Sequence, residues 1–313
     1  MRLKGLLCLC LSLGCMLCAN QAKGMTDTLM RESLHQLPEE CSDSIRVTNM
    51  LRDARNVSNE LHKKIIFFAK GFLGTPYAGG TLETFPLEHL VVRTDSVDCT
   101  TFVEYVLAMV VTDRIMQSQP KHPSSFSKQV ELQQNPYQLF KSSLQSIRYR
   151  NGQIDGYTSR LHYFSDWIVD NQNKGYVKEV TRKSPHLMRT TNLNFMSEHA
   201  SLYPFLANDT TAVRLLKEVE YRFLHYEMPY IAKQELGRGQ EILDIQDGDI
   251  LTFVTNVKGL DVVHVGFALW IQGKLHLLHA SSKEKHVLVD PSTIFDYSKN
   301  KKSHLGIRVI RIL

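Results

Sequence analysis

Five short segments in the last quarter of the chain alternate apolar with polar residues and are rich in β-branched side chains, as strands are. These segments are 249–254, 262–270, 274–280, 287–289 and 306–312. Gln272-Gly273, between the second and third, is a candidate two-residue hairpin turn. Upstream, in 26–74 and again in 99–111, apolar residues recur at helical spacing instead. Helices followed by an antiparallel meander predict an α+β fold.

The middle of the chain, about 115–245, is less regular. It contains a predicted helix near Ser165, a short strand near 176–180 and a helix near 210–226. No repeat or linker-like boundary interrupts it. We therefore expect residues 25–313 to form a single domain in which about 115–245 is an insertion packed on the core.

The N-terminus has the pattern of a secretory signal peptide. Arg2 and Lys4 precede an apolar stretch at 5–19, and 1–24 is predicted to be removed, leaving a mature start near Met25. Leu13-Gly14-Cys15 resembles part of a lipoprotein box, so a lipid anchor is the alternative to ordinary cleavage. No later segment reaches 18 apolar residues, which predicts an exported, periplasmic protein without a transmembrane segment.

Charge argues against a nucleic-acid partner. The formal net charge is +5, and three of the basic residues lie in the first 24 positions, which leaves +2 for the rest. Charged residues make up 22% of the chain and hydrophobic residues 43%, as in ordinary globular proteins. The basic character therefore belongs largely to the leader, and no nucleic-acid binding is expected.

Cys99 is the candidate nucleophile. Asp98 is a favourable N-cap, which would place Cys99 at the first helical position. There the helix dipole favours the thiolate, and free backbone N–H groups could receive an oxyanion. Four of the six cysteines lie in the leader, so the alternative for Cys99 is a disulfide with Cys41.

A thiol nucleophile needs an imidazole base and a group that orients it. On the strand 262–270, His264 shares a face with Gly266 and Ala268, and the other face is apolar. The next strand carries His276 and His279, which must point to opposite faces because they are three residues apart. Strand phase alone does not decide which of these two meets His264.

At these residues the chain resembles the NlpC-type cell-wall hydrolases, which are papain-like cysteine peptidases and amidases. The resemblance rests on an ordered set of motifs. They are Leu73-Gly74-Thr75-Pro76-Tyr77 with Gly79-Gly80, Asp98-Cys99 with Phe102-Val103, Gly248-Asp249-Ile250-Leu251, His264-Val265-Gly266 and His279-Ala280-Ser281. The resemblance implies a papain-like core with Cys99 as nucleophile, His264 as base and His279, in place of His276, as the orienting residue.

About 130 residues separate the predicted nucleophile from the predicted base, whereas the two are close in sequence in simple family members. By this spacing and by its segment 160–167, the chain is most similar to the N-acetylmuramoyl-L-alanine amidase-like branch of Gram-negative exported proteins. The resemblance implies a peptidoglycan stem peptide or muropeptide as substrate and requires no cofactor or metal.

The insertion also contains candidate substrate-binding residues. Arg160 could pair with a stem-peptide carboxylate, and His162 and Trp167 lie near it in sequence. For Trp167 a role as core filler is equally compatible. The resemblance places Tyr77 beside the nucleophile, and Asp98, next to Cys99, is also expected at the substrate. Glu104 is expected to hold the insertion.

Three functions compete at this stage. The first is a cysteine amidase cleaving the N-acetylmuramoyl-L-alanine amide through a thioester, with an endopeptidase cutting after D-Glu as its variant. The second is an acyltransferase on the same core. The third is a zinc amidase using His162, His264 or His279, which lacks a motif such as His-Glu-x-x-His.

Overall fold

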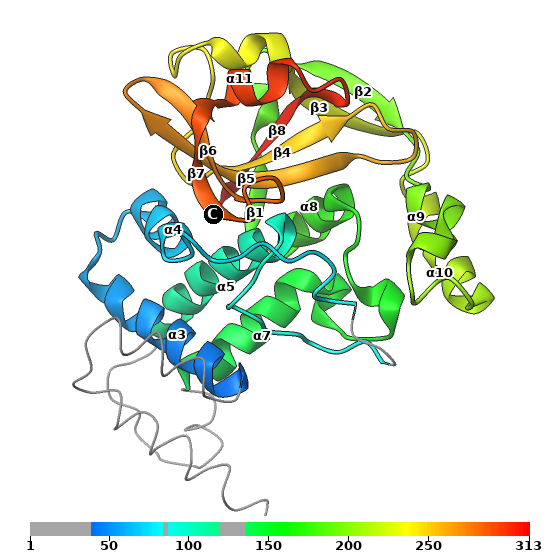
Figure 1. The fold of residues 1–313 in the computed structure, drawn as a ribbon, viewed down its shortest axis with the longest axis horizontal. Coiled ribbons are helices and arrows are strands. Elements are labelled where there is room, and N and C mark those ends of the chain that lie inside the picture. The colour runs from blue at the N-terminus through cyan, green and yellow to red at the C-terminus, as the bar shows by residue number, and fades with distance from the viewer. Residues whose placement is uncertain (1–38, 84–86, 119–134) are drawn as a thin grey trace, which may run out of the picture.

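The computed structural model describes residues 39–83, 87–118 and 135–313 (Figure 1). The predicted signal peptide and lipid-anchor site lie outside these residues, as does the side chain of Cys41. The α-helices are α3 (Glu39–Asp53), α4 (Leu61–Lys70), α5 (Cys99–Ser118), α7 (Pro136–Arg148), α8 (Phe164–Asn173), α9 (Phe195–Glu198), α10 (Thr210–Tyr221) and α11 (Ile294–Lys299). The strands are β1 (Val177–Glu179), β2 (Leu187–Thr191), β3 (Tyr226–Ala232), β4 (Ile250–Thr255), β5 (Val262–Ile271), β6 (Lys274–Ser281), β7 (His286–Thr293) and β8 (His304–Ile312).

The described strands form one antiparallel sheet in the order β2-β3-β8-β4-β5-β6-β7, with β1 paired to the end of β8. The predicted α+β class and the hairpin are confirmed. Gln272 and Gly273 have φ values of 50° and 74°, which a primed hairpin turn requires. One expectation is corrected: β8 does not end a meander, because it returns to pair with β4 and β3.

Helices cover one face of the sheet, and α11 lies over the other (Figure 1). Val265, Phe267, Leu278 and Ala280 face α5, where the rings of Phe102 and Phe267 meet edge to face at 5.4 Å. Leu251, Phe253, Ala268 and Leu277 form the core on the opposite side, beneath α11. Each sheet face therefore buries its own apolar set, as strand alternation requires.

Helix α5 is buried on all sides from Thr101 to Asp113, where the sequence predicted a single apolar stripe. It lies between the sheet and the other helices (Figure 1), so even its polar residues have protein partners. Lys64 donates to Asp113 at 2.6 Å, and Thr112 donates to Ser143 at 3.1 Å. These contacts hold the body of the helix within the core, whereas Cys99 and Thr100 at its start are half-buried.

The segment predicted as an insertion contributes both helices and strands. Its helix α7 packs beside α5, α8 packs against β1 and α7, and β1, β2 and β3 extend the sheet beyond β8. Arg148 of α7 donates to Glu104 of α5 at 2.7 Å, and both side chains are almost fully buried. This ion pair holds the insertion against α5, which is the role expected for Glu104. In the part of the chain described here, no helix is long and apolar enough to cross a bilayer.

Candidate active site

Helix α5 begins at Cys99, and Asp98 caps it. The Thr101 N–H donates to the Asp98 carboxylate at 2.7 Å, and the Asp98 N–H donates to the Thr101 hydroxyl at 2.9 Å. This reciprocal pair of bonds is a capping box built with threonine. The cap predicted from the sequence is therefore present, and it fixes the backbone that carries the Cys99 side chain.

Two backbone contacts bring Tyr77 beside the same helix start. The Ala78 N–H donates to the Val97 carbonyl at 3.0 Å, and the Tyr77 N–H donates to the Lys285 carbonyl at 2.8 Å. Burial, together with the nearby Cys99 and Asp98 groups, raises the pKa of the Tyr77 phenol to about 12. The phenol therefore stays protonated and can donate a hydrogen bond.

Cys99 is a free cysteine whose sulfur lies against strand β5. Burial raises the pKa of the thiol to about 12, and the Asp98 carboxylate is the second cause. Hydrogen bonds from the Val265 N–H and the Thr100 side chain oppose this rise without cancelling it. Desolvation and the neighbouring carboxylate therefore act against the effect of the helix start on Cys99 and favour a neutral thiol, which needs a base.

His264 and His279 are in direct contact. The distance from His264 Nε2 to His279 Nδ1 is 2.6 Å, and the rings are nearly perpendicular. In the pairing of β5 with β6, Leu269 lies opposite His276, so the two side chains share a face of the sheet. Leu269 points away from the face of His264, and His276 therefore does so too. Of the two strand histidines, the structure thus brings His279 to His264, as the resemblance implied.

Asp290 of β7 lies behind His279, with 3.5 Å between His279 Nε2 and the carboxylate. This contact is too long for a hydrogen bond, but the carboxylate favours the tautomer in which His279 Nε2 carries the proton and Nδ1 accepts from His264 Nε2. In that tautomer His264 Nδ1 is the unprotonated nitrogen and can take a proton. Sequence reasoning missed Asp290 because the predicted strand 287–289 stopped one residue short of it.

Both imidazoles are neutral at ordinary pH. Burial lowers the pKa of His264 well below its usual value, and the neighbouring His279 and Lys301 lower it further. Burial also lowers the pKa of His279 to about 4, although Asp290 opposes the shift. The ring of Tyr297 in α11 packs near both histidines, at centroid distances of 6.1 and 5.5 Å. A neutral His264 can act as a base.

The predicted substrate-binding residues of the insertion are engaged within the protein. Arg160 is almost fully buried and pairs with Glu83 at 2.8 Å and Glu88 at 3.2 Å. Its guanidinium group is therefore already matched by carboxylates, contrary to the expectation that it is available to a substrate.

His162 and Trp167 are likewise held inside the insertion. His162 Nε2 contacts the Tyr157 carbonyl at 2.8 Å, and the two rings lie 4.3 Å apart at an angle of 40°. Trp167 has no exposed surface and stacks on Phe164. The binding role predicted for Trp167 is wrong, because a fully buried ring cannot contact a substrate, and the core-filler alternative fits. Among the described residues, no three metal-ligating side chains are grouped so as to hold an ion.

Residues 67–307 match the family model described as N-acetylmuramoyl-L-alanine amidase-like, or AmiA-like. The chain belongs to this amidase-like family. Membership indicates a hydrolase of amide bonds and implies a peptidoglycan substrate. A search of curated proteins finds no match for this amidase-like chain.

Solved structures agree with the family. An N-acetylmuramoyl-L-alanine amidase from Bacteroides uniformis is 37% identical, with a TM-score of 0.71 over 82% of this chain and 100% of that one. A "putative xylanase" from Bacteroides fragilis is 40% identical, with a TM-score of 0.67 over 78% of this chain and 99% of that one. A Legionella pneumophila protein, 22% identical with a TM-score of 0.63 over 88% and 95% of the two chains, shares the fold of this amidase-like protein.

Proposed function

We propose that this protein is an exported cysteine amidase with a papain-like core that cleaves the N-acetylmuramoyl-L-alanine amide of peptidoglycan. The observation that carries the proposal is the family match across 67–307, which spans a free cysteine at a capped helix start and a pair of contacting histidines. Glycoside hydrolysis, which the Bacteroides fragilis name suggests, uses two carboxylates instead of a thiol and an imidazole.

The first half of the reaction forms a thioester. His264 Nδ1 takes the proton of the Cys99 thiol as sulfur attacks the carbonyl carbon of the lactyl amide. In this scheme the N–H groups in the first turn of α5 and the Tyr77 phenol donate hydrogen bonds to the oxyanion. Protonated His264 then gives its proton to the amide nitrogen, which leaves as the free amine of L-alanine.

The second half releases the sugar. Water attacks the thioester carbon while His264 accepts its proton, and the Cys99 sulfur leaves and is reprotonated. The product is the lactyl carboxylate of muramic acid. His279 positions the His264 ring, and Asp290 fixes the His279 tautomer, so both are positioning residues in this scheme.

The deciding experiment is mass spectrometry of purified muropeptides after incubation with the mature protein. An amidase releases the intact stem peptide and a free muramoyl carboxylate, whereas an endopeptidase releases a muramoyl dipeptide. An acyltransferase also releases the stem peptide, but it transfers the muramoyl group to an added amine, so the free muramoyl carboxylate does not form. Cys99→Ala, shown by circular dichroism to be folded, should abolish the reaction. Full activity in Cys99→Ala, together with loss on chelation, would favour a metal mechanism instead.

The predicted periplasmic location and lipid anchor are part of the same proposal. Fractionation of cells and mass measurement of the mature N-terminus test them. A start near Met25 supports ordinary cleavage, and a lipid-modified Cys15 supports the anchor.

A further inference from the structure

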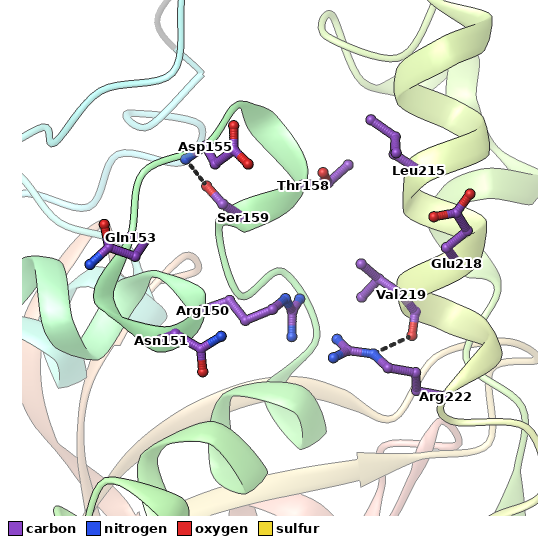
Figure 2. Close-up of a pocket in the computed structure, with 10 residues that line it drawn as sticks. All are labelled: Arg150, Asn151, Gln153, Asp155, Thr158, Ser159, Leu215, Glu218, Val219 and Arg222. Carbon is purple, nitrogen blue, oxygen red and sulfur yellow. Dashed lines mark hydrogen bonds between the residues drawn. The ribbon is translucent and has the colours of Figure 1, made fainter.

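A cavity of about 410 Å³ lies between residues 150–159 and helix α10. Figure 2 shows Arg150 and Arg222 approaching each other from its two sides. Neither Cys99 nor the two site histidines line it. The cavity is therefore distinct from the proposed active site, and its volume is in the range of small-molecule sites.

Two guanidinium groups at this cavity share one carboxylate. Arg150 Nη1 and Nη2 donate to both oxygens of Asp166, at 2.8 and 2.7 Å, and Asp166 is almost fully buried. Arg222 Nη2 reaches the same carboxylate only at 3.5 Å and is half exposed. The nearby Asp170 is paired with Lys174. The positive charge of Arg222 is thus only partly balanced on this side of the cavity.

The opposite charge lies on the other part of the lining. The Asp155 N–H donates to the Ser159 hydroxyl at 3.0 Å, which fixes the turn. Among the described residues, the exposed Asp155 carboxylate makes no hydrogen bond or ion pair. Glu218, also at the cavity, is engaged by Arg214 at 2.5 Å. Leu215 and Val219 supply an apolar wall between these groups. The cavity therefore offers a cationic region, an anionic group and a short apolar surface.

We propose that this cavity binds a small zwitterion, an amino acid or a short peptide with free termini. Its carboxylate would pair with the half-exposed guanidinium of Arg222, because Arg150 already donates both Nη groups to Asp166. Its ammonium group would face Asp155. A multiply charged anion such as phosphate fits less well, because Asp155 and Glu218 would repel it. This site goes beyond the proposed hydrolysis, which uses only the groups around Cys99.

The test is calorimetric titration of the full mature chain carrying Cys99→Ala, so that no turnover contributes heat. The probes are alanylalanine, its N-acetylated form, its C-amidated form and inorganic phosphate. Alanylalanine is expected to bind more tightly than either blocked form and more tightly than phosphate. Because hydrolysis is not measured, failure here is separate from failure of the proposed function.

The variants locate the binding. Arg222→Gln should weaken alanylalanine binding about tenfold, the usual effect of losing a charge-assisted contact. Asp155→Asn should weaken binding of the free dipeptide but not of its N-acetylated form. Lys217→Gln, at an exposed residue of the same helix that does not line the cavity, is the matched control and should bind as the parent does. Equal binding of all probes, preference for phosphate, or equal weakening by Lys217→Gln and Arg222→Gln would overturn the proposal.

Discussion

Gly266 of β5 and His279 of β6 lie so close together that a Cβ atom on Gly266 would be 2.8 Å from the Cβ of His279. The same added atom would lie 2.9 Å from the Leu278 carbonyl, so the backbone itself leaves no room. The absence of a side chain at position 266 therefore allows His279 to reach His264.

Gly266→Ala should displace His279 and break its contact with His264. We expect kcat on a defined muropeptide to fall about tenfold or more, with a stability cost of about 1–3 kcal/mol from overpacking. Gly237→Ala is the matched control, because an added Cβ there meets Phe295 at an ordinary 3.8 Å. Unchanged kcat in Gly266→Ala would show that the histidine contact is not needed.

The Cys99 thiol should be neutral in the resting protein, because burial and Asp98 raise its pKa to about 12. The ultraviolet thiolate absorbance, taken as the difference from Cys99→Ala, is expected to be absent at neutral pH and to appear only in strongly alkaline solution. Asp98→Asn should move its appearance to lower pH. A thiolate already present at neutral pH would instead indicate a resting thiolate–imidazolium pair.

His279 and His276 should differ sharply in their effect on turnover. His279→Ala is expected to lower kcat by orders of magnitude with little change in KM, because the base loses its orientation. His279→Asn should be milder, since an amide can still hydrogen-bond. His276→Ala should leave turnover within a few-fold, as His276 contacts only the Asp290 carbonyl at 3.1 Å among its recorded hydrogen bonds. An inactive His276→Ala protein would reverse this assignment.

Asp290 should matter through His279. Asp290→Ala is expected to lower kcat about tenfold with KM nearly unchanged, because the His279 tautomer is no longer fixed. Asp290→Asn should recover part of the loss through its amide oxygen. A double variant with His279→Ala should be no worse than His279→Ala alone; additive losses would mean that Asp290 acts independently of the histidine.

Stability should fall in mild acid. The pKa values of His279 and His304 are lowered to about 4, whereas in the unfolded chain they are near 6.5. Between these values the unfolded state binds more protons, so the free energy of unfolding decreases as pH falls. Urea denaturation across this range measures the slope. His304→Asn removes one such group and should reduce the slope of the free energy of unfolding against pH. An unchanged slope would show that other groups cause the acid sensitivity.

Local signals predicted much of the site. The Asp98 cap, the start of α5, the strand of His264 and the hairpin turn each depend on a few neighbouring residues, and sequence patterns record such features. The choice of His279 over His276 depended on resemblance, because it is set by the pairing register between two strands. That register is known only from the structure.

Long-range packing escaped prediction. Trp167 looked like a possible binding residue because burial cannot be read from a side chain's type alone. The pKa of Cys99 depends on the burial of the thiol as well as on the helix start, and that burial is set by the fold. Helix α7 was missed although Asn135 caps it and Pro136 begins it, both recognisable start signals. Asp290 joins the site only through the pairing of β6 with β7.

The position of β8 has a consequence for biosynthesis. This strand follows every other described element in sequence, yet it lies between β3 and β4. Until it emerges from the ribosome or the translocation channel, β4 lacks one neighbour and the sheet remains in two parts. Completion of the sheet must then wait for contacts between residues far apart in the chain, a slow step in folding. A nascent chain therefore lacks one neighbour of β4, the strand that pairs with the His264 strand, which would delay hydrolysis until β8 has emerged.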